Sequence, residues 1–328
     1  MRRAWRNGGV SAGAAVLVAL ALDLWGELPA AVHPVVGFGR LVRGLERIAP
    51  KGTHAQLAYG ALMLTVTLPC ATLPAMALER GAGEARRALA QRGHAGLGVV
   101  VEATVTGVGL TALFALRLLA QAGGEVRMAL ECDDLPAARE ALRNLVSRER
   151  ASLSAELVAA AAVESLAENL SDSVVSPLLA YALFGLPGAA AYRLVNTADA
   201  MIGYRGRYEY LGKATARCDD ALNLISSRLT AALVVLLAPL YSGDMRAGWR
   251  LWRRDAGRTA SPNAGQPMAA AAGTLGMQLE KVGHYTLGDP VRPATAARIA
   301  QAERMTWWVG GVAVGLCALL AAWRGSGQ

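Results

Sequence analysis

The stretch that decides the fold runs from Val163 to Ile202 and reads VESLAENLSDSVVSPLLAYALFGLPGAAAYRLVNTADAMI. Its runs of alanine, leucine and valine are typical of membrane segments, yet carboxylates and amides stand among them. Ionisable groups beside lipid are costly, and they usually mark chemistry or transport. We therefore expect the function to lie in this stretch and in the polar segment that follows it as far as Asn223.

The same stretch predicts an interrupted helix. Ser176 followed by Pro177 is typical of an N-cap and a first helical residue, and GLPG at 185–188 then ends that helix after about two turns. Such a helix is too short to cross a bilayer. We expect a second short helix from Ala189 to Ile202, and hence a broken or re-entrant hairpin over residues 173–202. Irregular backbone at membrane depth must be buried in protein or line a cavity, so the polar groups should face a cavity.

Composition indicates a membrane protein. The chain has 328 residues, of which 54% are hydrophobic, and its mean hydropathy of +0.31 is high for a soluble protein. Apolar stretches near the ~20 residues of a spanning helix occupy residues 10–24, 56–78, 97–120, 222–240 and 306–323. No strand-type alternation is sustained and no fixed-period repeat occurs. We predict an all-α, polytopic integral membrane protein with broken or re-entrant helices and helical loops. It should form a single membrane-embedded domain over residues 1–328, multi-pass in the inner (cytoplasmic) cell membrane.

Two further stretches need an interpretation of their own. Residues 10–22 follow three arginines and have the pattern of either a secretory signal or an anchor. We favour an uncleaved anchor, because no small-x-small cleavage site follows cleanly. The stretch from Pro136 to Val163 predicts a surface helix pair, since Ala138 and Leu142 fall on one apolar face with charged residues outside it. We expect this part to be solvated.

The charge of +8 does not indicate a nucleic-acid partner, because the basic residues are scattered over many loops without interleaved aromatic residues. Anionic lipid headgroups and phosphorylated substrates explain these residues more simply, so membrane lipid is an expected partner. Basic residues fall in successive loops, which conflicts with the positive-inside rule unless some apolar stretches do not cross. The four cysteines lie far apart and predict reduced thiols, and the four isolated histidines argue against a zinc site or a catalytic triad.

Three carboxylates form a candidate metal site. Glu164, Glu168 and Asp172 stand at i, i+4 and i+8, which would place them on one helical face. Like charges at that spacing repel, and bound Mg²⁺ would relieve the repulsion by taking hard oxygen ligands from them and from substrate phosphates. In the alternative interpretation Asp172 caps the next helix, and the glutamates pair with Arg148 or Arg150.

A second polar group surrounds the end of the predicted hairpin. Tyr192, Asn196 and Asp199 share a helical face. A further polar stripe consists of Asp219, Asn223, Ser226 and Thr230. Hydrogen bonding between helices explains Ser226 and Thr230 sufficiently. A buried carboxylate needs a cation or a proton, so Asp199 and Asp219 remain candidates for catalysis, with Asn196 beside them.

Two loops carry candidate substrate-binding groups. The cationic loop contains Arg205, Arg207, Lys213 and Arg217, whose donors suit phosphate. It is not a P-loop, because Ala214 stands where Ser or Thr should hold Mg²⁺; an ordinary cytoplasmic loop is the alternative. The second loop, SPNAGQP at 261–267, predicts a rigid turn in which Asn263, Gly265 and the backbone are placed to orient a carboxylate or an amide.

Several motifs together resemble the CobD/CbiB family, and the resemblance covers nearly the whole chain. They are LDL at 22–24, HPV at 33–35, ESLAEN at 164–169 with Asp172, NTADAM at 196–201, RDA at 254–256 and SPNAG at 261–265. Similar proteins tend to read Gly-Asp-Pro where this chain has Gly26-Glu27-Leu28-Pro29, so Glu27 receives no role. A later Gly288-Asp289-Pro290 stands in another context.

The resemblance implies a cobinamide-phosphate synthase. Members of the family join the free propionate of adenosylcobyric acid to an aminopropanol, commonly (R)-1-aminopropan-2-ol O-phosphate, in an ATP-dependent amide ligation. Mg²⁺ and ATP are then the expected cofactor and co-substrate, and other late enzymes of cobalamin biosynthesis are candidate partners. A membrane transporter and a non-catalytic membrane sensor or scaffold are the alternatives, because broken helices with carboxylates are also typical of transport.

Overall fold

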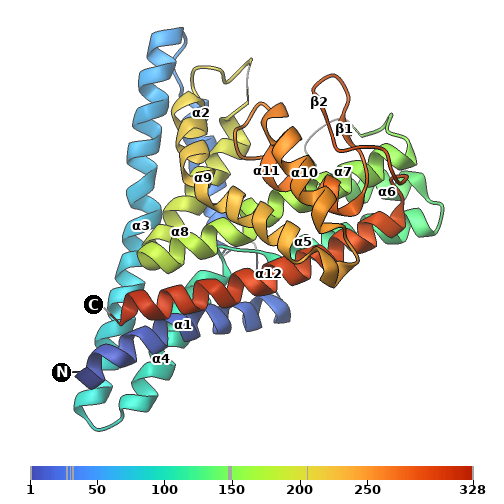
Figure 1. Cartoon of the computed structure of the whole chain (residues 1–328). Coiled ribbons are helices and arrows are strands. Elements are labelled where there is room, and N and C mark those ends of the chain that lie inside the picture. The colour runs from blue at the N-terminus through green and yellow to red at the C-terminus, as the bar shows by residue number, and fades with distance from the viewer. Residues whose placement is uncertain are drawn as a thin grey trace. The chain divides into compact units, whose positions relative to one another are not determined.

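The computed structural model describes residues 2–26, 29, 31, 33–146, 150–204 and 206–326, and the side chains from residue 8 onward within those ranges. The chain is 79% helical, and the one sheet of the described part pairs two three-residue strands in antiparallel fashion, with Leu279 opposite Leu287. The prediction of an all-α membrane fold is therefore confirmed (Figure 1).

Figure 1 colours the helices and strands in chain order, from blue at the N-terminus to red at the C-terminus. Their bounds are α1 Arg2–Trp25, α2 Pro34–Arg47, α3 Thr53–Gln91, α4 Ala95–Thr111, α5 Leu116–Glu131, α6 Leu135–Ala141, α7 Ala155–Leu170, α8 Ser176–Ile202, α9 Lys213–Leu236, α10 Met245–Asp255, α11 Gly265–Leu275, β1 Leu279–Lys281, β2 Tyr285–Leu287 and α12 Ala296–Gly325. A π-helical turn, Ser171–Val175, joins α7 to α8.

Five helical runs in the described residues are long and apolar enough to cross a membrane. They are Gly8–Trp25, Thr53–Gln91, Ala95–Glu131, Ala155–Ile202 and Ala296–Gly325. The predicted stretches 10–24, 56–78, 97–120 and 306–323 lie inside four of these runs. The fifth predicted stretch, 222–240, does not, because it starts within α9, whose charged residues Asp219, Asp220 and Arg228 keep it from being apolar enough.

The chain packs as two compact units. Unit 1 consists of Met1–Ala115, Ser176–Leu222 and Ala313–Gln328, and unit 2 consists of Leu116–Val175 and Asn223–Val312. Neither is continuous in sequence, and α9 and α12 each contribute residues to both. A single domain over residues 1–328 stays a prediction.

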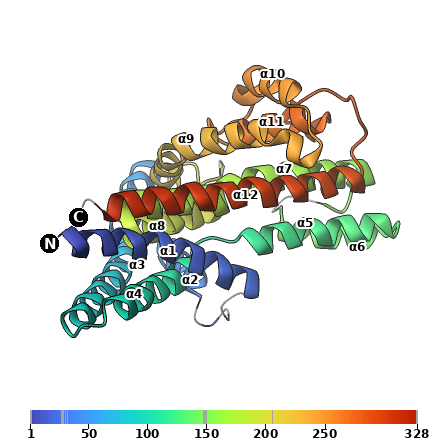
Figure 2. The same cartoon turned by 60° about the horizontal axis from the view of Figure 1, so that its bottom comes forward.

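Small residues bring the helices of unit 1 close together. The helix α1 packs along α4, and α3 packs against α4 and α8; α1 and α4 lie side by side in both Figure 1 and Figure 2. A Cβ atom on Gly107 would lie 2.9 Å from the backbone oxygen of Ala15, and one on Gly13 would lie 2.9 Å from that of Ala318. Glycine is therefore what allows these helices to approach, as is usual between membrane helices.

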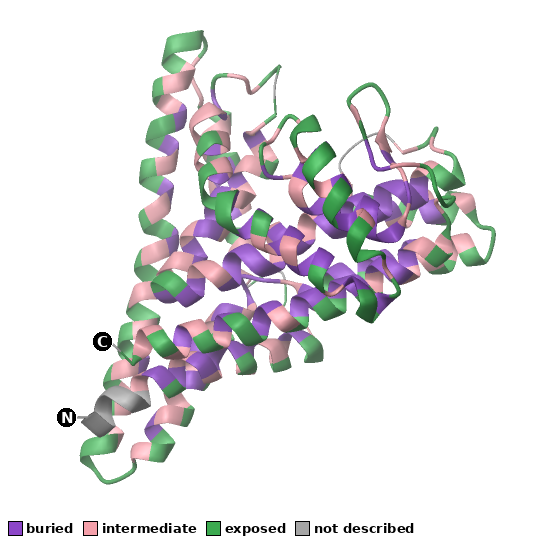
Figure 3. Ribbon diagram, viewed as in Figure 1, coloured by how far each residue is buried: buried purple, intermediate pink, exposed green. Residues whose placement is uncertain are grey.

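Unit 2 is built around α7, which is buried along most of its length (Figure 3). The helix contacts α5 and α11, and its alanines at 159–162 are nearly inaccessible to solvent. This corrects the prediction that Pro136 to Val163 is a solvated pair. Ala138 and Leu142 do form the expected buried face of the first part, but from Val158 onward the chain lies inside the protein, where small alanines allow close packing.

The predicted break at 185–188 is confirmed. Gly185 has φ 73° and ψ −168°, a backbone conformation that interrupts α8 and that glycine adopts without strain. The predicted N-cap at Ser176 is wrong, because the π-helical turn leads directly into α8 with Ser176 as its first residue. Pro177 has no N–H to offer the carbonyl four residues earlier, and a locally widened turn accommodates that loss.

The loop between α8 and α9 rests on one backbone contact. A Cβ atom on Gly212 would collide with the backbone oxygen of Ile202, so the start of α9 approaches the end of α8 as closely as glycine allows. Around this contact Val42, Met63 and Leu211 form a buried hydrophobic cluster with Ile202. The cluster holds the polar ends of α8 and α9 next to each other.

We predict that Gly212→Ala destabilises the protein by about 1–3 kcal/mol, the usual effect of forcing a group into filled space. The measurement is thermal unfolding of the detergent-solubilised protein. Gly44→Ala is the matched control, because nothing lies within 4 Å of its added Cβ and it sits in the helix α2; that change should be neutral or slightly stabilising. If Gly212→Ala and Gly44→Ala unfolded at the same temperature, the close approach of Gly212 to Ile202 would not contribute to stability.

Candidate functional site

In unit 1, a polar row links α8 to α9. The Nδ2 atom of Asn196 donates a hydrogen bond to Oδ1 of Asp219 at 3.4 Å, and Nη1 of Arg193 donates to Oδ1 of Asn196 at 3.3 Å. Asp219 is buried, with 9% of its surface exposed. The amide of Asn196 thus stands between a guanidinium and a carboxylate, so it orients the carboxylate. Two of the three predicted catalytic residues, Asn196 and Asp219, are brought together.

Asp199 lies one turn further along α8 and is half-buried. A Cβ atom on Gly203 would collide with Oδ1 of Asp199, so the absence of a side chain at 203 leaves room for this carboxylate. Arg193 has no counterpart in the sequence prediction. It could have been found, because it is the one basic residue in an otherwise apolar run from Ser176 to Val195.

The cationic loop of unit 1 is tied to acidic neighbours. Nη2 of Arg207 lies 3.4 Å from Oε1 of Glu46, and the hydroxyl of Tyr208 donates to the same oxygen at 2.5 Å. The hydrogen bond to Glu46, aided by burial, raises the pKa of Tyr208. The Arg207 guanidinium also lies 5.1 Å from the centre of the Tyr208 ring. Arg207 is nevertheless 80% exposed, so an incoming anion can reach it.

The remaining cations of that loop are differently placed. Nζ of Lys213 lies 3.3 Å from Oε1 of Glu209, one turn away, and both side chains are substantially exposed. Arg217 is exposed on α9. Arg205 lies outside the described residues. Phosphate binding by this loop stays a prediction, in which an anion replaces or joins the carboxylates of Glu46 and Glu209.

In unit 2, the predicted metal ligands are only partly aligned. Glu164 is buried, with 4% of its surface exposed, and Glu168 is half-buried one turn later on α7. Asp172 lies in the π-helical turn rather than in the α-helix. Asp172 therefore does not continue the regular α-helical series of Glu164 and Glu168, and metal binding by the three carboxylates stays a prediction. Accordingly, no group of three or more His, Cys, Asp or Glu residues that could hold a metal ion occurs in the described residues.

The donor set still fits Mg²⁺ held by two carboxylates and substrate phosphates. Glu164 and Glu168 remain at i and i+4 on α7, and Mg²⁺ commonly takes one or two carboxylates besides phosphate oxygens. Oγ of Ser171, next to Asp172, is buried and has no hydrogen-bond partner among the described residues. A buried hydroxyl without a partner suits a ligand that supplies a hydrogen-bond donor or a charged group.

The turn at 261–267 is anchored to α9. The hydroxyl of Ser227 and Nη1 of Arg228 each donate to Oδ1 of Asn263 at 3.3 Å, and Asn263 is 5% exposed. The backbone N–H of Gly265 donates to Oγ1 of Thr259 at 3.1 Å. A Cβ atom on Gly265 would collide with the backbone oxygen of Ala256. These contacts give Asn263 and Gly265 definite structural roles, and substrate binding by them stays a prediction.

The sequence indicated no role for Asp255, which joins two segments of unit 2. Its carboxylate is fully buried and accepts hydrogen bonds at 2.8 Å from Nε and Nη2 of Arg254 and from the backbone N–H of Gly288; Nε of Arg258 lies 3.2 Å away. Burial alone would raise the pKa of Asp255, but the hydrogen bonds from Arg254 and Gly288, with the charges of Arg254 and Arg258, outweigh it and lower the pKa. The signal was present in the RDA motif, whose aspartate ties the turn after α10 to the chain that follows β2.

Residues 16–306 match the profile of the family described as CobD/Cbib protein. The chain is 42% identical over 280 residues to the cobalamin biosynthesis protein CobD of Dehalococcoides mccartyi, covering 84% of this chain and 87% of the relative. It is 41% identical over 295 residues to the protein of the same name in Geobacter metallireducens, covering 87% and 89%. A probable cobalamin biosynthesis protein CobD of Methanothermobacter thermautotrophicus is 40% identical over 277 residues, covering 84% and 86%. No solved structure matches the chain.

We predict that Asp255→Asn destabilises the protein by about 2 kcal/mol at pH 7, the scale of hydrogen bonds to a charged group. The folded-state pKa of Asp255 is lowered, so its contribution is complete above the unfolded pKa of about 4 and is lost as the pH falls through the folded pKa. The stability gap between the wild type and Asp255→Asn should therefore shrink below about pH 4. Unfolding measured across pH checks this.

The control for that experiment is Asp289→Asn. Asp289 also pairs with Arg254, at 2.8 Å, but its side chain is 41% exposed. An exposed pair contributes less than about 1 kcal/mol. A gap between the wild type and Asp255→Asn that does not change with pH would mean that the Asp255 charge is not what stabilises the network.

Proposed function

Since the chain belongs to the CobD/CbiB family, we propose that it acts in cobalamin biosynthesis as a cobinamide-phosphate synthase. In this reaction the free propionate carboxylate of adenosylcobyric acid is joined through an amide bond to (R)-1-aminopropan-2-ol O-phosphate, or to aminopropanol itself, with consumption of ATP. The family match carries the proposal. Support from the structure comes from buried carboxylates and amides among apolar helices, where such groups usually mark chemistry or transport.

Amide formation requires an activated carboxylate. A carboxylate oxygen of the propionate attacks the γ-phosphorus of ATP, ADP leaves, and an acyl phosphate results. The amine nitrogen then attacks the acyl carbon, inorganic phosphate leaves, and the nitrogen loses a proton. The chain must therefore supply cations for two phosphate groups, an acceptor for the amine proton and a place for a large amphipathic corrinoid.

The residues of unit 1 suit the amine. Asp219 is buried and held by Asn196, so its carboxylate has a fixed orientation toward an ammonium group or a departing proton. Asp199, one turn from Asn196, offers a second carboxylate for the same purpose. Arg207 lies in the loop between α8 and α9, and Lys213 and Arg217 lie in the first turns of α9, where they would bind the phosphate of the amine substrate or of ATP.

The residues of unit 2 suit the nucleotide. Glu164 and Glu168 would hold Mg²⁺, and bound Mg²⁺ would neutralise charge on the phosphoryl group being transferred. The glutamates would contribute negative charge, and the hydroxyl of Ser171, which is buried without a hydrogen-bond partner among the described residues, would donate to a phosphate or a bound water. Asn263 and Gly265 would orient the propionate through the turn that Ser227 and Arg228 hold in place.

A membrane transporter is the second candidate, and the break in α8 at Gly185 favours it, because interrupted helices are typical of transporters. The candidates differ in what the purified protein does with ATP, adenosylcobyric acid and the amine. A synthase forms the amide and releases ADP and phosphate in detergent solution. A transporter or a sensor leaves the corrinoid chemically unchanged, and that result with active substrates would refute the synthase.

We predict that Glu168→Gln loses most ligation activity while folded yield stays normal, because one charge is removed from the metal pair without a change of volume. Titration with Mn²⁺, followed by electron paramagnetic resonance, should show weaker binding. Glu156→Gln is the control, since Glu156 is exposed at the first turn of the same helix. Near-normal activity of Glu168→Gln at limiting Mg²⁺ would make the glutamates structural.

We predict that Arg207→Ala weakens phosphate binding by about ten- to a hundredfold, the equivalent of 1.5–3 kcal/mol for a charge-assisted hydrogen bond. If Arg207 holds the amine's phosphate, the variant is impaired with aminopropanol phosphate and little changed with aminopropanol. If it holds ATP, both amines suffer alike and the apparent affinity for ATP falls.

Arg143→Ala provides the matched control for Arg207→Ala. Arg143 is also exposed and paired with a surface glutamate, Glu140, at 2.9 Å, but it lies in unit 2 outside the proposed site. Kinetics of Arg207→Ala that equal those of Arg143→Ala with both amines and with ATP would leave Arg207 with only its contacts to Glu46 and Tyr208.

A further inference from the structure

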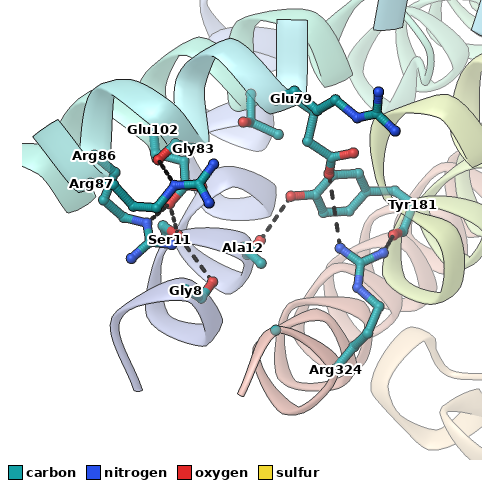
Figure 4. Close-up of a pocket in the computed structure, with 13 residues that line it drawn as sticks. Gly8, Ser11, Ala12, Glu79, Gly83, Arg86, Arg87, Glu102, Tyr181 and Arg324 are labelled. Carbon is teal, nitrogen blue, oxygen red and sulfur yellow. Dashed lines mark hydrogen bonds and ion pairs between the residues drawn. The ribbon is translucent and has the colours of Figure 1, made fainter. Parts of the chain in front are cut away.

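A cavity in unit 1 has no part in the proposed ligation. Its volume is about 520 Å³, and residues of α1, α3, α4, α8 and α12 line it (Figure 4). Its charged lining residues are Glu79, Arg80, Arg86, Arg87, Glu102 and Arg324. Four arginines against two glutamates leave a formal excess of two positive charges in a hollow among apolar helices.

The two glutamates are already neutralised within the cavity wall. Oε2 of Glu102 lies 2.7 Å from Nε of Arg86 and also accepts a hydrogen bond from the Ser11 hydroxyl. Oε1 of Glu79 accepts from the backbone N–H of Leu186 at 3.3 Å and lies 4.0 Å from Nη2 of Arg324. Both pairs are drawn in Figure 4.

The excess positive charge therefore belongs to Arg80 and Arg87. Both are exposed, and neither is in an ion pair with a carboxylate among the described residues. Arg87 donates from Nε to the backbone oxygen of Gly83 at 3.3 Å, a bond that does not use its two Nη groups. A second donor is also in excess, because Nε of Arg324 is buried without a hydrogen-bond partner among the described residues. Guanidinium groups in this number suit the oxygens of a phosphate.

The position of the cavity favours a lipid headgroup as the source of this phosphate. Gly325, which lines the cavity, is the last residue of α12 and of the candidate span Ala296–Gly325. The cavity therefore lies beside the end of this candidate span. Beside its lining residue Arg324, Trp323 is 77% exposed, and Leu319 one turn earlier is 71% exposed. An exposed tryptophan with leucine on one helical face is typical of the lipid boundary.

We propose that this cavity binds the phosphate of an anionic phospholipid, with the headgroup at Arg80 and Arg87 and the acyl chains along the exposed apolar face of α12. Fixed arginines favour an anionic headgroup over a zwitterionic one, because the excess charge of the cavity is matched only by a net negative ligand. The site is separate from the residues assigned to ligation, so it stands or falls independently of that activity.

The test is a double variant, Arg80→Gln with Arg87→Gln, in purified detergent-solubilised protein. Native mass spectrometry measures retention of phosphatidylglycerol and of phosphatidylcholine across a lipid titration. The wild type should retain phosphatidylglycerol preferentially, and the double variant should weaken that affinity about tenfold or more. Both arginines are exposed, so the variant should fold, and an unchanged melting temperature confirms that it does.

The matched control is Arg40→Gln with Arg47→Gln on α2. These arginines are exposed, belong to the same unit, have the same spacing of seven residues and do not line the cavity. A second arm adds inorganic phosphate to the lipid-bound wild type. If millimolar phosphate displaces the lipid, the site takes free phosphate as well, and if it does not, the lipid is the ligand. Equal phosphatidylglycerol retention by the wild type, the double variant and the control would overturn the proposal.

Discussion

A break in the backbone of an apolar helix must be satisfied by the protein itself, and at Gly185 the carboxylate of Glu79 does so. It accepts the N–H of Leu186, the first residue after the break, and leaves no space for a side chain at Gly185. Arg324 lies 4.0 Å from Glu79 and donates at 2.8 Å to the backbone oxygen of Tyr181, one turn before the break. One glutamate and one arginine thus join α3, α8 and α12 within unit 1, and the shape of α8 depends on them.

The fold was predictable where local chemistry decides it. The apolar stretches identified four of the five candidate spans, and the GLPG sequence identified the break, because glycine conformation and proline are local properties. The π-helical turn at 171–175 was not predictable, since an α-helix and a widened turn share nearly the same sequence preferences. That turn contains Asp172, one of the predicted metal ligands. The burial of α7 was not predicted, because the alanine-rich sequence of this helix indicates neither burial nor exposure until the neighbouring helices are known.

The candidate site was predictable in residue type more than in arrangement. Asn196 and Asp219 are 23 residues apart in the sequence, and a hydrogen bond joins their side chains. A shared function of these two residues would require such a contact. Asp255 was overlooked because its backbone partner Gly288 lies in the chain after β2, and the cavity arginines were overlooked because residues of five helices form that cavity. Charged residues that are scattered along the sequence come together only in the folded protein. Arg80 and Arg86, which the sequence interpretation counted among the arginines of successive loops, lie within α3 and line one cavity.

The division of the chain into interleaved units has a consequence for biosynthesis. The last segment of unit 1, from Ala313, follows all of unit 2 in the order of synthesis, yet it supplies Ala318 as the close neighbour of Gly13 in α1. The first helix must therefore remain in the membrane without that partner while some 300 further residues emerge. Contacts between such remote segments form slowly. The glycine-lined face of α1 is then open during translation, and other membrane proteins or chaperones have their opportunity to engage it before α12 arrives.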